Sequence, residues 1–309
     1  MILARSTSFE GVVRSLWLVV RSPWFVVRSC SVAVVVWSGA LTLLSGVSAQ
    51  SDAYEGFSAG GLHYVEEGHG PVVVLIHAFH MDLREWDDVA PELTGSRRIV
   101  RYDVRGHGSS RVAGPLPSPS ADLSTLLDEL RIDGVTLVGS SMGATIALEL
   151  ALTAPTRVER LILVAPGVPG VKQGASPAWL SPIMSVVRAG DPSRAAELWW
   201  DSPLFEALRA RPKAAARIRR VVADNARIWG LSRAPGLTPP AGSRLEEVAV
   251  PVTVIAGDRD QFGSQDVGRI LAGRVRAGEM IVLEGAGHMI ALERPRQLSK
   301  IILRSMSPR

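Results

Sequence analysis

Short apolar runs alternate with stretches of helical periodicity over most of the chain. Seven runs have the length and composition of strands, at residues 62–65, 72–76, 98–103, 135–138, 160–164, 252–256 and 280–283. The runs that begin at Val72, Val135 and Val252 are apolar on both faces, as buried parallel strands are. Helical spacing occurs between the runs, at residues 83–93, 121–130, 142–152, 264–272 and 294–303. This alternation predicts an α/β fold with a parallel sheet and helices on both faces.

The alternation stops between residues 166 and 250. This segment has no buried strand pattern, and helical patches occur at residues 178–187, 193–200 and 203–229. It holds four of the eight tryptophans, namely Trp179, Trp199, Trp200 and Trp229. We expect some of these rings to pack a small core of the insertion and others to line an apolar pocket beneath it. The predicted organisation is therefore a core of residues 50–165 and 251–309, interrupted by a helical insertion at 166–250.

The first 49 residues have the order of a secretory signal peptide. Arginines punctuate the start, residues 30–44 form an uncharged and largely apolar run, and Val47-Ser48-Ala49 offers small residues for cleavage. Cleavage there predicts a secreted, periplasmic or cell-envelope protein that begins at Gln50. The apolar run is shorter than the roughly 20 residues of a membrane span. Attachment to a membrane through an uncleaved N-terminus is the alternative.

Composition argues against several functions. Although the pI is 9.7, four arginines and one glutamate precede residue 50, so the rest of the chain has 30 basic and 29 acidic residues. A nearly neutral body without a basic run argues against nucleic-acid binding. Cys30 is the only cysteine, so neither an intrachain disulfide nor a thiolate pair for a metal can form. The histidines also lack paired metal-binding spacing, and we expect neither a metal nor a cofactor.

Gly139-Ser140-Ser141-Met142-Gly143 is the strongest local signal in the chain. It lies between a predicted strand and a predicted helix, which is the context in which a G-x-S-x-G motif exposes a nucleophilic serine on a sharp turn. Ser141 has glycine two residues before it and two residues after it, whereas Ser140 does not. We therefore expect Ser141 to be the nucleophile of an acyl-transfer enzyme.

Four further motifs follow predicted strands. They are Leu75-Ile76-His77-Ala78-Phe79-His80, Asp103-Val104-Arg105-Gly106-His107-Gly108-Ser109, and the pair Ala256-Gly257-Asp258-Arg259-Asp260 and Gly285-Ala286-Gly287-His288 near the C-terminus. Together with the serine motif, and in this order, they resemble the α/β-hydrolase superfamily, of the type with a helical cap after the sixth strand. The resemblance runs from about residue 55 to the end of the chain. It implies a mostly parallel eight-stranded sheet with helices on both faces.

The resemblance also implies roles for individual residues. Ser141 would be the nucleophile, His288 the general base and Asp260 the acid that orients His288, with Asp258 as the alternative acid. The backbone N–H groups of Phe79 and Met142 would form the oxyanion hole.

Other residues of these motifs are expected to support the site. His77, Asp103 and Arg105 would brace the loops around it. We expect His80 to be a solvated loop residue, with a polar group that faces the pocket as the alternative. Ala78 replaces the glycine that the family usually has, and its methyl group could tighten the oxyanion loop.

The implied activity is that of a serine hydrolase without a cofactor, which cleaves a carboxylic ester or a related acyl bond through an acyl-enzyme. The tryptophans of the insertion favour a small to medium, apolar substrate. Relatives with the same triad also cleave amides, lactones, thioesters and carbon–carbon bonds. A cofactor-free haloperoxidase or perhydrolase is the enzymatic alternative. A ligand-binding protein with a vestigial site is the alternative of another class. The serine at the nucleophile position of the G-x-S-x-G motif excludes the alkyl-enzyme chemistry of relatives that carry aspartate at this position.

Overall fold

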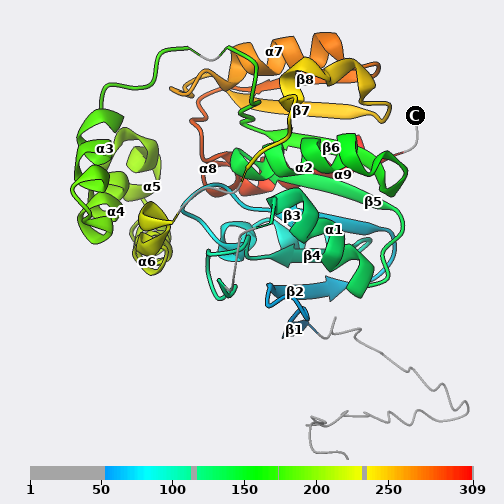
Figure 1. The fold of residues 1–309 in the computed structure, drawn as a ribbon, viewed down its shortest axis with the longest axis horizontal. Helices are drawn as coiled ribbons and strands as arrows, with labels where there is room; N and C mark the ends of the chain where they lie inside the picture. Colours follow the sequence, from blue (N-terminus) through cyan, green and yellow to red (C-terminus); the bar gives the residue numbers. More distant parts are fainter. Residues whose placement is uncertain (1–52, 113–116, 173, 232–234, 308–309) are drawn as a thin grey trace, which may run out of the picture. The chain divides into compact units, whose positions relative to one another are not determined.

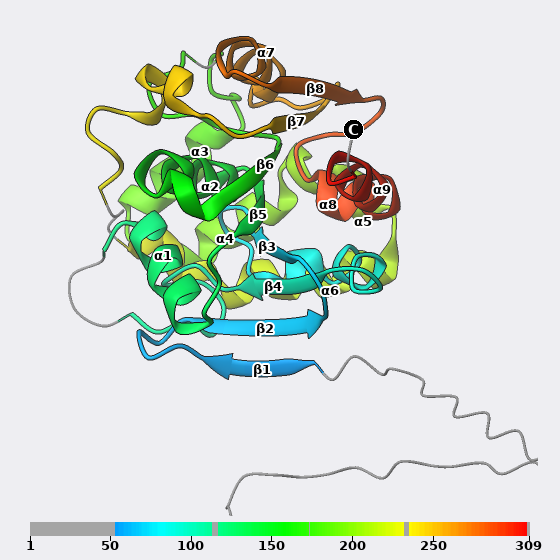
Figure 2. The ribbon, with the colours of Figure 1, turned by 90° about the vertical axis from the view of Figure 1, so that its right-hand side faces the viewer.

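The computed structural model describes residues 53–307 except 113–116, 173 and 232–234, so the predicted signal peptide lies outside the described residues. The sheet has eight strands in the order β1-β2-β4-β3-β5-β6-β7-β8 (Figures 1 and 2). The strands are β1 Tyr54–Phe57, β2 His63–Gly68, β3 Val72–Ile76, β4 Arg98–Tyr102, β5 Val135–Ser140, β6 Val158–Val164, β7 Val252–Gly257 and β8 Gly278–Leu283. The pairings β1–β2 and β2–β4 are antiparallel, and all others are parallel. This confirms the predicted mostly parallel eight-stranded sheet.

Strand β1 is the strand that the apolar pattern did not reveal. Its residues are exposed apart from one of intermediate exposure, so it carries no buried alternation. It pairs with β2 at the edge of the sheet, with Tyr54 opposite Glu66 and Phe57 opposite His63. Backbone pairing, which the sequence pattern does not report, therefore defines this strand.

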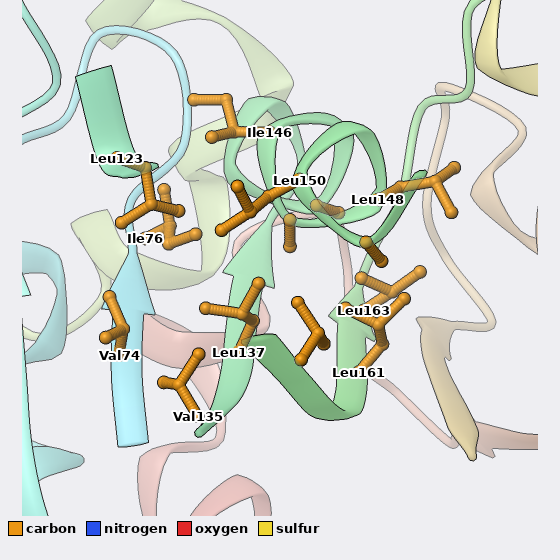
Figure 3. Packing of buried hydrophobic residues seen from close by; sticks show 14 of the residues in the cluster. Val74, Ile76, Leu123, Val135, Leu137, Ile146, Leu148, Leu150, Leu161 and Leu163 are labelled. Atoms are coloured by element: carbon orange, nitrogen blue, oxygen red, sulfur yellow. The ribbon is translucent and has the colours of Figure 1, made fainter. Parts of the chain in front are cut away.

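Helices cover both faces of the sheet. The helices α1 (Pro119–Glu129), α2 (Met142–Thr153) and α7 (Ser264–Arg274) lie on one face, and α8 (Ile290–Glu293) and α9 (Pro295–Ser305) lie on the other (Figure 2). Strand β3 shows how both faces are filled, because Val74 and Ile76 join the first cluster of buried side chains while Val73 and Leu75 join the second. Figure 3 shows the first cluster, in which the helix α2 packs on β5 and β6.

The predicted helix at residues 83–93 is wrong in its type. The segment instead forms two short 3₁₀ turns, η1 (Leu83–Trp86) and η2 (Ala90–Glu92). Trp86, Val89 and Leu93 are fully buried against the second face of the sheet, which explains the helical spacing. Pro91 has no N–H to donate within a continuous helix, so a separate 3₁₀ turn, with Pro91 in its first turn, forms there instead.

We call the segment between β6 and β7 the cap. Its four helices are α3 (Leu180–Arg188), α4 (Pro192–Asp201), α5 (Glu206–Arg209) and α6 (Pro212–Asp224). Short 3₁₀ turns complete the fold, namely η3 Pro155–Arg157, η4 Pro203–Phe205, η5 Ala226–Gly230, η6 Ala241–Ser243 and η7 Leu245–Glu247. The cap helices gather beside one end of the sheet (Figure 1).

A separate cluster of buried side chains joins the cap to the rest of the fold. Phe205, Ile218 and Val221 of the cap region pack in one cluster with Met81 and Met289 of the sheet loops. These contacts seat the cap on the loops that follow β3 and β8. Among the described helices, none is both long and apolar enough to cross a bilayer.

Candidate active site

Ser141 occupies a strained turn between β5 and α2. Its φ of 51° and ψ of −103° lie outside the usual regions for a residue with a side chain, and its N–H donates to Val164 O at 2.8 Å. A Cβ atom on Gly139 would lie 2.2 Å from Gly143 O, and one on Gly143 would lie 2.1 Å from Ile76 O. The close backbone approach on both sides explains why glycine must flank this serine.

Three side chains from three different loops meet at this turn. His288 Nε2 lies 2.9 Å from Ser141 Oγ, and His288 Nδ1 lies 2.7 Å from Asp260 Oδ2. The three residues follow β5, β7 and β8, and parallel strands place their carboxyl ends at the same edge of the sheet. The residues expected to act together are thus brought into one chain of hydrogen bonds.

The hydrogen bonds of Asp260 distinguish it from Asp258. Its buried carboxylate also accepts the Phe262 N–H at 2.8 Å and the Ser264 hydroxyl. Burial alone would raise the pKa of Asp260, but the charge of protonated His288 and these hydrogen bonds lower that pKa below its ordinary value. Asp258 is exposed. Since a carboxylate only accepts, the Nδ1 of His288 carries the proton and its Nε2 is left to accept from Ser141.

The two predicted oxyanion donors both border the same cavity as Ser141. Met142 is the first residue of α2, where N–H groups have no acceptor within the helix. The Ala78 carbonyl accepts from His77 Nδ1 at 2.8 Å and from the Met81 N–H at 3.1 Å. Because the C=O and N–H of a trans peptide point in opposite directions, the Phe79 N–H is directed away from those two donors.

His77 connects the loop after β3 to the loop after β4. Its Nε2 accepts the Val104 N–H at 2.9 Å, so the ring proton must sit on Nδ1 and be donated to Ala78. The ring is fully buried, and this burial lowers the pKa of His77. A neutral ring that donates at one nitrogen and accepts at the other fits the expected bracing role.

Asp103 and Arg105 hold the loop after β4 through separate partners. Asp103 Oδ2 accepts from His63 Nδ1 and from the Ser109 N–H, both at 2.8 Å. Arg105 forms a bidentate pair with Asp122, at 2.7 and 2.6 Å. These charge-assisted bonds hold the loop that packs behind His77.

His80 does not lie in solvent as expected. The side chain is fully buried, and its ring centroid lies 4.1 Å from that of Trp229 and 5.8 Å from that of Trp199. This burial lowers the pKa of His80 to about 3, so the ring is neutral at physiological pH. The cap tryptophans, more than a hundred residues away in the sequence, cover it.

Sequence reasoning missed Glu85. This side chain is fully buried beneath the oxyanion loop, and its Oε2 accepts the Ala78 N–H at 2.6 Å. Burial raises the pKa of Glu85 to about 7. An isolated acid in a segment of helical spacing normally indicates a solvated face, so the sequence carried no signal for this contact.

A cavity of about 870 Å³ opens over Ser141 and His288. Its walls come from the oxyanion loop, α2 and the cap, the cap side chains being Leu180, Met184, Val187, Trp199 and Trp229. This volume and apolar lining are typical of a small-molecule site. Among the residues that the structure describes, no group of His, Cys, Asp or Glu side chains could hold a metal ion.

Comparison with known proteins assigns the family. The profile of the alpha/beta hydrolase family matches residues 73–301. The chain belongs to this family. This hydrolase is 28% identical over 266 residues to a putative 2-succinyl-6-hydroxy-2,4-cyclohexadiene-1-carboxylate synthase of Bacillus subtilis, covering 78% of the chain and 94% of that protein. It is 25% identical over 249 residues to 3-oxoadipate enol-lactonase 2 of Acinetobacter baylyi, covering 78% and 91%.

A solved structure is similar over nearly its whole length. The crystal structure of a hydrolase from Pseudomonas aeruginosa has a TM-score of 0.66 and 26% sequence identity, covering 83% of this chain and 99% of that one. The family and these relatives identify the protein as an enzyme of the hydrolase type.

Proposed function

We propose that this hydrolase cleaves carboxylic esters, or closely related acyl bonds, through a Ser141-His288-Asp260 triad and a covalent acyl-enzyme. The observation that carries the proposal is the continuous hydrogen-bonded relay, with contacts of 2.9 Å from Ser141 to His288 and 2.7 Å from His288 to Asp260. A hydroxyl next to an imidazole that a carboxylate orients is the arrangement that activates serine as a nucleophile.

The reaction proceeds in two halves. Ser141 Oγ attacks the acyl carbon while His288 Nε2 accepts the hydroxyl proton, and the same nitrogen then returns the proton to the departing alkoxide. In the second half, His288 Nε2 takes a proton from a water molecule that attacks the acyl carbon, and it returns that proton to Ser141 Oγ as the bond to the serine breaks and the acid is released. The ionised Asp260 stabilises the imidazolium that forms in each half, and its lowered pKa supports this role.

Negative charge develops on the substrate carbonyl oxygen in both halves. The N–H groups of Phe79 and Met142 would stabilise this charge by donating hydrogen bonds to the oxygen, and such fixed donors are often the largest single contribution to catalysis. The orientation of the Ala78–Phe79 peptide by His77 and Met81 supports the assignment of Phe79.

The walls of the cavity favour an apolar substrate of small to medium size. Trp199 and Trp229 border it from the cap, together with the aliphatic side chains of Leu180 and Val187. The name of the enol-lactonase relative supports ester chemistry, because a lactone is a cyclic ester.

The test is a series of p-nitrophenyl esters of increasing acyl length, assayed with the wild type and Ser141→Ala. We expect hydrolysis that depends on Ser141 and a KM that falls with chain length until the cavity is filled. Undiminished turnover by Ser141→Ala would contradict the proposal. A folded wild type that hydrolyses no ester would favour carbon–carbon cleavage, perhydrolysis or the ligand-binding alternative.

We also propose that the mature enzyme begins at Gln50 and acts outside the cytoplasm. The support is the signal-peptide order of residues 1–49. Intact mass spectrometry of the protein recovered from the cell envelope or medium tests this. A mass that includes residues 1–49 would contradict cleavage and favour an N-terminal anchor.

A further inference from the structure

Glu85 is a fully buried acid that the proposed reaction does not use. It lies in η1, on the loop that follows β3, and its side chain has no contact with solvent. One oxygen, Oε2, accepts the Ala78 N–H at 2.6 Å. The other, Oε1, has no well-formed hydrogen bond within the described part of the chain.

Three hydrogen bonds hold the backbone of Ala78. Its carbonyl accepts from His77 and from Met81, and its N–H donates to Glu85, so Ala78 is fixed both at its N–H and at its C=O. The Phe79 N–H belongs to the peptide that begins with that carbonyl. The direction of the Phe79 N–H therefore depends on how Glu85 holds the preceding amide.

Glu85 also lies close to the turn that carries Ser141. The Ser140 hydroxyl, next to the nucleophile, is fully buried and has no well-formed bond to any other described residue. It lies near enough to the Glu85 carboxyl to lower that group's pKa against the larger effect of burial. The carboxyl thus lies close to both segments that carry the predicted oxyanion donors, at Ala78 and at Ser140.

An apolar side chain could fill the same space without the cost of burying a carboxyl. What such a side chain cannot supply is an acceptor for the Ala78 N–H. An amide N–H left unpaired here would allow the loop to turn toward another acceptor. The oxygen atom, rather than the volume or the charge, is therefore the property that this position provides.

We propose that Glu85 is a positioning residue that sets the direction of the Phe79 N–H through its bond to Ala78. The proposal rests on the proposed acyl-transfer function and deepens it. Glu85 is fully buried and does not line the cavity, whereas Ala78 and Phe79 do, so it does not touch the substrate.

The test compares Glu85→Met with Glu85→Gln. Methionine keeps the length and approximate volume of the side chain but removes the acceptor, whereas glutamine keeps an acceptor for Ala78 and removes the charge. For Glu85→Met we expect kcat on a p-nitrophenyl ester to fall about 10- to 100-fold with KM nearly unchanged, less than the 10²–10³-fold loss on removing an oxyanion donor outright. Glu85→Gln should retain kcat within about threefold of the wild type.

A boronic acid inhibitor supplies a readout that a merely structural role would not change. Its tetrahedral adduct places an oxygen in the oxyanion hole, so its affinity should fall in Glu85→Met by the same factor as kcat. Hydrogen–deuterium exchange should also speed up at residues 77–81 in this variant, independently of activity. If Glu85→Met does not fold, Glu85→Asp carries the same expectation, because its carboxylate is one methylene too short.

Three results would overturn the proposal. They are a Glu85→Met enzyme with wild-type kcat, a loss confined to KM with unchanged boronate affinity, or a folded Glu85→Gln enzyme as impaired as Glu85→Met. Each requires an active wild type, so it is distinct from failure of the hydrolase function itself. A wild type that a fluorophosphonate does not label at Ser141 would remove both proposals together.

Discussion

Replacing Glu85 by glutamine should change how the stability of this hydrolase depends on pH. Burial raises the pKa of Glu85 from 4.5 to about 7, so the folded protein holds this proton more tightly than the unfolded chain does. The wild type therefore loses stability as the pH rises from 4.5 through 7, and the loss is complete above pH 7. The full effect is about 3 kcal/mol, of which about 2 to 3 kcal/mol falls between pH 5 and pH 8.

Glutamine cannot ionise, so the variant lacks this contribution. Urea unfolding followed by tryptophan fluorescence at pH 5 and pH 8 gives the free energy of unfolding of both proteins. Relative to the wild type, Glu85→Gln should gain about 2 to 3 kcal/mol on going from the lower to the higher pH. Other titrating groups are common to both proteins and cancel in this comparison.

The exposed Glu92 offers a matched control. Glu92→Gln removes the same charge from the surface, and its stability should follow the wild type at both pH values. If Glu85→Gln and the wild type also gave parallel curves, burial could not raise the pKa of the Glu85 carboxyl.

Three other substitutions test the site. Asp260→Asn should lower kcat by a factor on the order of 10³–10⁴ while KM stays within a few fold, because the imidazole loses the carboxylate that orients it. Steady-state kinetics on a p-nitrophenyl ester measures this. A loss of this size in Asp258→Asn, with wild-type kcat in Asp260→Asn, would reverse the assignment. Gly143→Ala would place a Cβ atom 2.1 Å from Ile76 O, so we expect a lower melting temperature and a large loss of kcat. A variant with wild-type values of both would show that the backbone of Ile76 does not approach Gly143 so closely. Trp229→Ala removes part of the apolar wall of the cavity. Because the acyl chain then loses roughly 1.5–3 kcal/mol of apolar burial, kcat/KM for the longer p-nitrophenyl esters should fall by about 10- to 100-fold, with little change for the acetate ester. An equal loss of kcat/KM for every ester would place the ring outside the substrate-binding surface.

The sheet could be predicted because buried parallel strands leave apolar runs, and most of its helices because their apolar residues recur at helical spacing. The runs at Val72, Val135 and Val252 needed no knowledge of their neighbours, since both faces of each strand are covered. The edge strand β1 left no such run, because its side chains are mostly exposed. Residues 83–93 have a misleading pattern, because burial on one side gave helical spacing to a segment that forms two 3₁₀ turns.

The site was partly predictable for a related reason. Ser141, Asp260 and His288 each follow a strand in motifs whose local spacing can be read directly from the chain. Glu85 and His80 could not be placed in the same way. The contact of Glu85 with Ala78 crosses a loop, and His80 is buried by tryptophans of a cap that follows far later in the sequence. Both environments are tertiary, and both run against the usual exposure of polar side chains.

Covalent labelling tests the proposed nucleophile most directly. A fluorophosphonate probe should add one label per chain to the folded wild type, and tandem mass spectrometry should locate that label on Ser141. His288→Ala, with the melting temperature of the wild type, should be labelled far more slowly. A label on Ser140 or on another residue, or no label on a folded wild type, would contradict the account.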